Sequence, residues 1–296
     1  METARLKAFL CATQTGSFSK AAEILRYTPS GVSQLVNSLE DELGFPLLLR
    51  NRRGVSLTAN GQLLLPAIQE LLAQEKRIEQ MAAEVKGLAV GSITVAAFSS
   101  IAIHWLPDII KSFQDQYPQI SISLMGGIRQ EVCDWLDNKQ ADVGFFSYQE
   151  PMPYDWLPLA KDRMLAVLPL DHPLAGAAAY PLKNCVNERF IMTGMGRDDD
   201  VAKMMENNNI KPQISFITRE YYAAIALVEK SLGMSIMNEL ITRHCRICDA
   251  VMIPLDPPQE ITMGLAVPSL KEATPAVRCF VDFAVKKLSR PDALTD

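Results

Sequence analysis

The sequence of 296 residues predicts a helical head, a long connecting helix and a larger α/β body. Three observations lead to this prediction. Residues 17–58 have the pattern of two short helices followed by a basic hairpin, and residues 58–88 carry apolar side chains at coiled-coil spacing. From residue 90 onward, apolar strand-like segments alternate with helical ones, which is typical of parallel sheets covered by helices.

The first pattern is a helix, a tight turn and a second helix between about residues 18 and 43. Thr28 is a good N-cap and Pro29 a good first helical residue, because proline lacks only an N–H that would be unpaired there. One apolar stripe is expected to be buried, and Gly44 to end the helix. The side chains left exposed on the leading turns are short and polar, which suits a helix in the major groove of DNA: Ser30, Ser33, Gln34 and Asn37.

A basic hairpin follows the second helix. Its turn, residues 51–54, lies between the apolar segments 45–49 and 55–57, and Arg50, Arg52 and Arg53 lie in or beside it. Such arginines can lie along DNA phosphates, although an ordinary surface helical hairpin is the plainer alternative. Residues 1–60 carry seven Lys or Arg against five Asp or Glu, and the rest carries 22 against 29. A basic head on an acidic body favours DNA binding at the head.

These segments resemble the N-terminal winged helix-turn-helix of LysR-type transcriptional regulators, bacterial proteins that bind DNA and respond to small molecules. The matching pieces, at 6–9, 16–22, 32–34, 39–44 and 57–61, agree in order and spacing. The resemblance implies an all-α winged helix-turn-helix domain over residues 1–60. The recognition helix departs from the family, because Gln34-Leu35 stands where Arg-Gln is usual, so phosphate affinity should depend on the hairpin. The expected DNA contacts are Thr28, Pro29, Ser30, Ser33, Gln34, Asn37, Arg50, Arg52 and Arg53.

A long helix is predicted over residues 58–88, with Thr58 as its N-cap. Its apolar residues follow a four-three spacing, which defines a coiled-coil seam: Leu64, Ile68, Leu71, Ile78, Ala82 and Val85. Polar residues on the other faces indicate a solvated rod, so we expect a homodimer through this helix. A helix buried in its own monomer would show the same stripe. The resemblance further implies that two dimers pair through their α/β bodies as a homotetramer.

The order of elements in residues 90–296 resembles that of the LysR-type effector domain. That domain has two α/β lobes, as periplasmic-binding-protein-like folds do. The first lobe is expected at about 90–161 and 267–296, and the second at 162–266. Predicted strands lie at 92–97, 120–125, 141–146, 164–168, 190–192, 214–217 and 234–237. Residues 261–267 begin the return of the chain to the first lobe. Predicted helices lie at about 99–116, 130–138, 199–207, 222–232 and 276–288.

A small-molecule effector, an anionic or polar metabolite, is expected between the lobes at the carboxyl ends of the strands. Ser99 and Ser100 follow the first strand and begin a helix, where hydroxyls and N–H groups can hold an anion, or one of them simply caps the helix. Aromatic residues at strand ends serve the core about as often as a ligand. The full set of expected contacts is Ser99, Ser100, Ile128, Arg129, Phe146, Ser147 and Tyr221.

Two other classes of function stay open. Cys245 and Cys248 form the only close pair among six cysteines, and neighbouring cations would lower a thiol pKa, as in a redox-sensing regulator. The other alternative is a solute-binding or enzymatic α/β protein whose residues 1–60 contact only proteins. No catalytic triad, metal or cofactor is expected, because the three histidines are scattered. With no signal peptide and no uninterrupted apolar span, the expected location is cytoplasmic.

Overall fold

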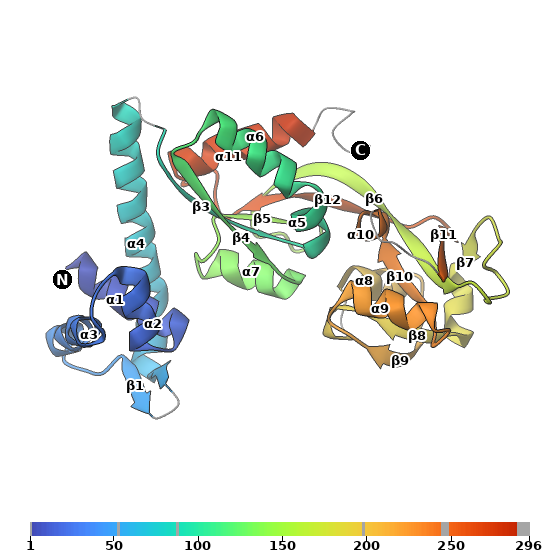
Figure 1. Ribbon diagram of the computed structural model, residues 1–296, viewed down its shortest axis with the longest axis horizontal. Coiled ribbons are helices and arrows are strands. Elements are labelled where there is room, and N and C mark those ends of the chain that lie inside the picture. Colours follow the sequence, from blue (N-terminus) through green and yellow to red (C-terminus); the bar gives the residue numbers. More distant parts are fainter. Residues whose placement is uncertain (1, 52–53, 87–88, 197–198, 244–248, 289–296) are drawn as a thin grey trace. The chain divides into compact units, whose positions relative to one another are not determined.

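The computed structural model describes residues 2–51, 54–86, 89–196, 199–243 and 249–288. The chain folds as two compact units, Met1–Leu88 and Ala89–Asp296. The elements of the first unit are labelled in Figure 1. They are α1 (Thr3–Thr15), α2 (Phe18–Leu25), α3 (Pro29–Leu43), β1 (Leu48–Asn51), β2 (Gly54–Leu57) and α4 (Ala59–Val85).

The helices of the first unit begin and end where local chemistry predicts. Thr28 caps α3 by accepting a 3.1 Å hydrogen bond from the N–H of Gly31, and Gly44 ends it with φ +82°. Thr58 caps α4 in the same way, at 2.9 Å from the N–H of Gly61. The predicted stripe of α3 is confirmed over its first three positions, which are fully buried, whereas the fourth is only partly buried: Val32, Val36, Leu39 and Leu43.

Strands β1 and β2 form the predicted antiparallel hairpin, with Asn51 opposite Gly54. The Val55 N–H donates a 2.9 Å hydrogen bond to the carbonyl of Gly16, which ties the hairpin to the turn between α1 and α2. Gly54 has φ +127°, and a Cβ there would lie 2.5 Å from the same carbonyl oxygen. Only glycine satisfies both conditions without strain. Arg52 and Arg53 lie outside the described residues.

Helix α4 divides into two parts. Ile68 is buried in the core formed by α1 to α3, and Lys7 of α1 pairs with Glu75 at 2.9 Å. Further along, Ile78 is 67% exposed and Val85 is 89% exposed. The predicted seam is therefore not one continuous surface, because its first part completes the core of its own head. The exposed positions of the predicted seam are Leu71, Ile78, Ala82 and Val85.

The second unit begins with β3 (Gly91–Ala97), and Figure 1 shows its two lobes joined by long strands. The elements of the first lobe are α5 (Ser99–His104), α6 (Leu106–Gln116), β4 (Ile120–Gly126), α7 (Arg129–Asp137), β5 (Val143–Ser147), β12 (Glu260–Val267) and α11 (Pro275–Leu288). Strand β6 (Asp155–Pro169) runs on into the second lobe. The elements there are β7 (Tyr180–Pro181), β8 (Arg189–Met192), α8 (Asp199–Asn207), β9 (Gln213–Ile217), α9 (Tyr221–Glu229), β10 (Ser235–Asn238), α10 (Glu239–Thr242) and β11 (Ala250–Asp256), with short 3₁₀ turns at Leu182–Asn187 and Gly194–Gly196.

The described residues of this unit form one mixed sheet of eight strands, in the order β4-β3-β5-β12-β6-β11-β7 with β10 also paired to β6. Strands β4, β3 and β5 are parallel, as predicted, but β12, β6, β10 and β11 pair antiparallel. The expectation of parallel sheets alone was wrong, because β6 and β12 run between the lobes in opposite directions. Strands β8 and β9 form a separate parallel pair.

The two lobes have separate hydrophobic cores. In the first, Phe113, Phe145 and Phe280 pack edge-to-face beneath β3, β5 and β12. Met263 and Leu265, which the predicted boundary assigns to the second lobe, lie in this core, so the return to the first lobe comes nearer residue 260 than 267. The predicted helix 99–116 is broken at Trp105 into α5 and α6. No helix among the described residues is both long and apolar enough to cross a membrane.

Candidate DNA-binding face and effector cleft

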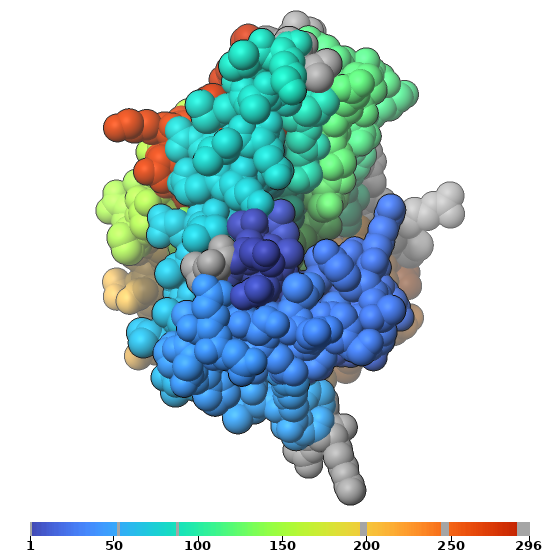
Figure 2. Space-filling view, turned by 90° about the vertical axis from the view of Figure 1, so that its left-hand side faces the viewer, coloured from blue at the N-terminus to red at the C-terminus, as the bar shows by residue number. Residues whose placement is uncertain are grey.

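Helix α3 presents a polar face outward from the first unit. The apolar stripe behind this face is fixed in the core. The exposed residues of the face are Thr28, Pro29, Ser30, Gln34 and Asn37. In Figure 2 the helices α1 to α3 form the blue part of this unit's surface, and α4 is the cyan column. An exposed polar helix held by a buried back is the arrangement that enters a DNA major groove.

Arg50 of β1 is held against this helix instead of extending away from it. Its guanidinium donates to Ser33 Oγ at 3.2 Å, to the Asn37 side-chain oxygen, and to Glu40 Oε2 at 3.0 Å. The same group lies 5.0 Å above the Phe18 ring, within the range of a cation–π contact. The structure thus gives Arg50 a second role beside the predicted phosphate contact, because it fixes the hairpin to α3.

In the second unit, a cavity of about 120 Å³ lies between the lobes. The first lobe contributes the residues after β3 and β4, and the second contributes the turn that precedes α9. The lining residues are Phe98, Ser99, Gly126, Gly127, Ile128, Arg219, Glu220 and Tyr221. Three of the predicted effector contacts therefore meet here: Ser99, Ile128 and Tyr221.

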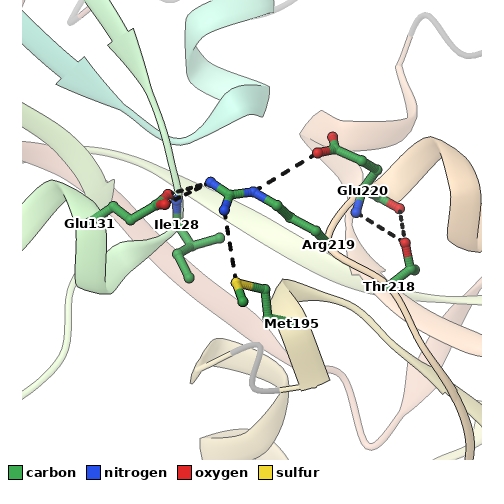
Figure 3. A network of polar contacts seen from close by, with 6 residues as sticks. All are labelled: Ile128, Glu131, Met195, Thr218, Arg219 and Glu220. Atoms are coloured by element: carbon green, nitrogen blue, oxygen red, sulfur yellow. Dashed lines mark hydrogen bonds and ion pairs between the residues drawn. The ribbon is translucent and has the colours of Figure 1, made fainter. Parts of the chain in front are cut away.

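The polar edge of this cavity is an ion pair between the lobes, drawn in Figure 3. Arg219 Nη2 donates to both oxygens of Glu131, at 2.7 Å each, and Arg219 Nε lies 4.0 Å from Glu220. The Ile128 N–H donates to the same Glu131 carboxylate at 3.1 Å. Burial raises the pKa of Glu131, but the hydrogen bonds from Arg219 and Ile128 outweigh it, so this pKa lies below its ordinary value.

The other predicted contacts do not line this cavity. Phe146 and Ser147 are fully buried, and Phe146 packs against Trp156 with ring centroids 5.5 Å apart, so it belongs to the core. Arg129 is not an open cation, because it donates to the carbonyl and hydroxyl of Ser147 and stacks over Phe146 at 5.1 Å. Ser100 is buried. Neither serine caps α5, whose N-cap position is Phe98.

Several residues of the cleft were not anticipated from the sequence. Arg219 and Glu220 directly precede helix α9 of the second lobe. A charged pair at a predicted helix start is the sequence feature that could have pointed to them as cleft residues. Glu131 carries no signal of its own, because its partner lies 88 positions away. Cys245 and Cys248 lie outside the described residues. Among the residues that are described, no three His, Cys, Asp or Glu side chains lie together as a metal site would require.

A helix-turn-helix with an exposed polar helix, joined to a two-lobed domain with a cleft, defines the class of ligand-responsive transcriptional regulators that bind DNA. Residues 3–62 match the bacterial regulatory helix-turn-helix protein, lysR family, and residues 86–289 match the LysR substrate binding domain. The chain belongs to the LysR family of transcriptional regulators. Membership of this family rejects the alternative of an enzymatic or solute-binding α/β protein.

Relatives and solved structures agree with this assignment. The HTH-type transcriptional regulator YvbU of Bacillus subtilis is 34% identical over 287 residues, which cover 96% of this chain and 98% of that protein. The full-length structure of OxyR from Pseudomonas aeruginosa has a TM-score of 0.74 at 20% identity and covers 98% of both chains. CbnR, a LysR family transcriptional regulator, has a TM-score of 0.67 at 21% identity, with coverage of 98% and 100%. At these identities the two structures show the shared fold.

Proposed function

We propose that this regulator is controlled by a small polar or anionic metabolite that binds in the cavity between the lobes. The observation that carries the proposal is that both lobes line the cavity. Ser99 and Ile128 come from one lobe, and Arg219 and Tyr221 come from the other. A ligand that touches both lobes binds more tightly to one arrangement of the lobes than to another. Such a ligand shifts the population of arrangements, which is the physical basis of control by an effector.

We further propose that DNA is read by a dimer. Gln34 and Ser30 lie exposed on α3 and are the expected base contacts, while the hairpin arginines contact phosphates. The exposed end of α4 around Ile78 and Val85 supplies the dimer surface. A two-fold dimer presents two recognition helices to paired half-sites. Pairing of two dimers into a tetramer through the α/β units is expected from the family.

The effector proposal is tested by calorimetric titration. Unbiased selection of bound genomic fragments identifies neighbouring genes, and the metabolites of those genes form the ligand panel. For a metabolite that binds the wild type, Ser99→Ala should weaken affinity roughly 2- to 13-fold, the loss of one neutral hydrogen bond. Ser123→Ala, an exposed serine of β4 outside the cavity, is the matched control. Equal affinities for wild type, Ser99→Ala and Tyr221→Ala would place the effector elsewhere.

A further inference from the structure

Two residues that line the cavity between the lobes already bind a carboxylate of the protein itself. Glu131 of α7 accepts two 2.7 Å hydrogen bonds from Arg219 and one of 3.1 Å from the Ile128 N–H (Figure 3). Both donors line the cavity, and they come from different lobes. Together, Arg219 and the Ile128 N–H therefore form a binding site for one carboxylate.

We propose that the effector carries a carboxylate, which replaces that of Glu131 on Arg219 and on the Ile128 N–H. Glu131 is then an internal competitor of the effector. This inference rests on the proposed function of the cavity as the effector site. It adds the chemical class of the ligand and the group that the ligand must displace.

The hydrogen-bond donors of the cavity favour this class. Arg219 donates from one nitrogen, Nη2, to both oxygens of the Glu131 carboxylate, and charge-assisted hydrogen bonds of this kind favour an anionic group such as a carboxylate. Arg219 and Glu220 together leave the lining without net charge, so the class of ligand follows from the hydrogen-bond donors, and a neutral ligand would leave the ion pair in place. The Glu131 side chain is 30% exposed, so it can turn toward water without burying its charge.

The rest of the cavity sets the size of the ligand. Because one carboxylate replaces another on the same donors, the exchange itself contributes little net affinity. The remaining affinity must come from the walls, where Phe98, Ile128 and Tyr221 offer apolar surface. The volume of about 120 Å³ is close to that of a cavity of about 150 Å³ that admits benzene. A carboxylate on one small ring or short chain fits this space.

The exchange also has a regulatory consequence. The pair of Glu131 and Arg219 links α7 of the first lobe to the turn before α9 in the second. When a ligand carboxylate takes the place of Glu131, the direct link between the lobes is replaced by one that passes through the ligand. The link at Arg219 then lasts only while the ligand is bound, and Glu131 takes its place again when the ligand leaves.

Glu131→Ala gives a direct test, with acetate as the probe. The substitution removes one methylene and the carboxylate, which are the atoms that acetate restores. Acetate well above its dissociation constant should raise the Tm of full-length Glu131→Ala by roughly 2–4 °C. Acetamide, its neutral counterpart, should not. Ionic strength is held constant with chloride.

Two control variants make the test specific. Glu220→Ala removes the neighbouring carboxylate of the same cavity but leaves Glu131 on its donors, so it should respond to acetate no more than the wild type. Adding Arg219→Met to Glu131→Ala should abolish the response. Equal responses to acetate and acetamide, or equal responses of Glu131→Ala and wild type, would overturn the proposal. If Glu131→Ala is unstable, Glu131→Gln retains the size of the side chain. This variant should bind acetate more weakly than Glu131→Ala but more tightly than the wild type.

The metabolite titration separates this inference from the proposed function. For a carboxylate metabolite that binds the wild type, Glu131→Ala should bind it roughly 1.5- to 5-fold more tightly, because the internal competitor is gone. A purely structural role for Glu131 gives weaker binding instead and overturns the inference, while the cavity remains the effector site. A response to acetate without any metabolite binding to the wild type supports the carboxylate site and counts against the proposed function.

Discussion

Ser147 donates a 2.7 Å hydrogen bond to Asp200, which joins the end of β5 in the first lobe to helix α8 in the second. Gln149 donates a second hydrogen bond of 2.7 Å to the same carboxylate oxygen. Ser147 is fully buried, and its hydroxyl also accepts from Arg129 at 3.0 Å. Asp200 thus provides a polar link between the lobes in addition to that of Arg219 and Glu131.

Asp200→Ala should destabilise the second unit. The buried Ser147 hydroxyl and the Gln149 amide both lose a charged acceptor, and each such hydrogen bond contributes about 1.5–3 kcal/mol. Part of this will be recovered by water, since Asp200 is only partly buried. Thermal unfolding should show a lower Tm than wild type, whereas Asp115→Ala, at an exposed position of α6, should not. Equal Tm values for both variants would show that the link is not stabilising.

Gln34→Ala should change which DNA sequences are bound. Gln34 is exposed on α3, and its amide can pair with a base edge in the major groove. The expected cost is about 1–3 kcal/mol at the base that it reads, with little change in affinity for unrelated DNA. Selection of bound fragments before and after the substitution measures this. An unchanged preference would remove Gln34 from base recognition.

The hairpin should supply affinity that does not depend on sequence. Replacing Arg52 and Arg53 with alanine should weaken binding to all DNA and flatten its dependence on salt by about 0.9 units of log–log slope for each lost phosphate contact. Arg50→Ala is the contrasting variant, because Arg50 bonds to Asn37 and Glu40 and its loss should lower the Tm of the first unit. An unchanged salt slope would exclude Arg52 and Arg53 from the interface.

The exposed end of α4 should hold the dimer. Ile78→Asp places a charge in an apolar contact, so sedimentation should show a weaker dimer while the unfolding of the first unit stays the same. Ile68→Ala should instead destabilise the first unit and leave the dimer contact unchanged, since Ile68 is 6% exposed in the core of its own head. A buried Ile→Ala change costs about 2–5 kcal/mol. A dimer that survives Ile78→Asp unchanged would place the partner surface elsewhere.

Local features of this chain were predictable because neighbours in sequence determine them. Thr28 and Gly44 bound α3 through contacts within a few residues, and the spacing of Val32, Val36 and Leu39 needs only the helical repeat. Helix α8 and strand β9 were likewise predicted closely from their patterns. The resemblance to a family added the two lobes, which no local pattern contains.

What the sequence did not predict depends on contacts between distant segments. Strand β11 was missed, because a strand is recognised by its partners, and its partner β6 lies more than 80 residues earlier. Phe146 has the same local pattern as a ligand contact, yet the rings of Tyr154 and Trp156 enclose it. Glu131 and Arg219 meet only when both lobes have formed.

Helix α4 belongs to the head's core at Ile68 and reaches solvent at Ile78, and the two parts are one continuous helix. The rotational phase between the recognition helix and the partner surface is therefore set by the number of residues between these positions. One inserted residue would turn the partner surface by about 100° and advance it by about 1.5 Å. Seven would restore the angle to within about 20° and lengthen the rod by about 10 Å. The register of this helix, more than its composition, would then set the spacing of the DNA half-sites that a dimer can span.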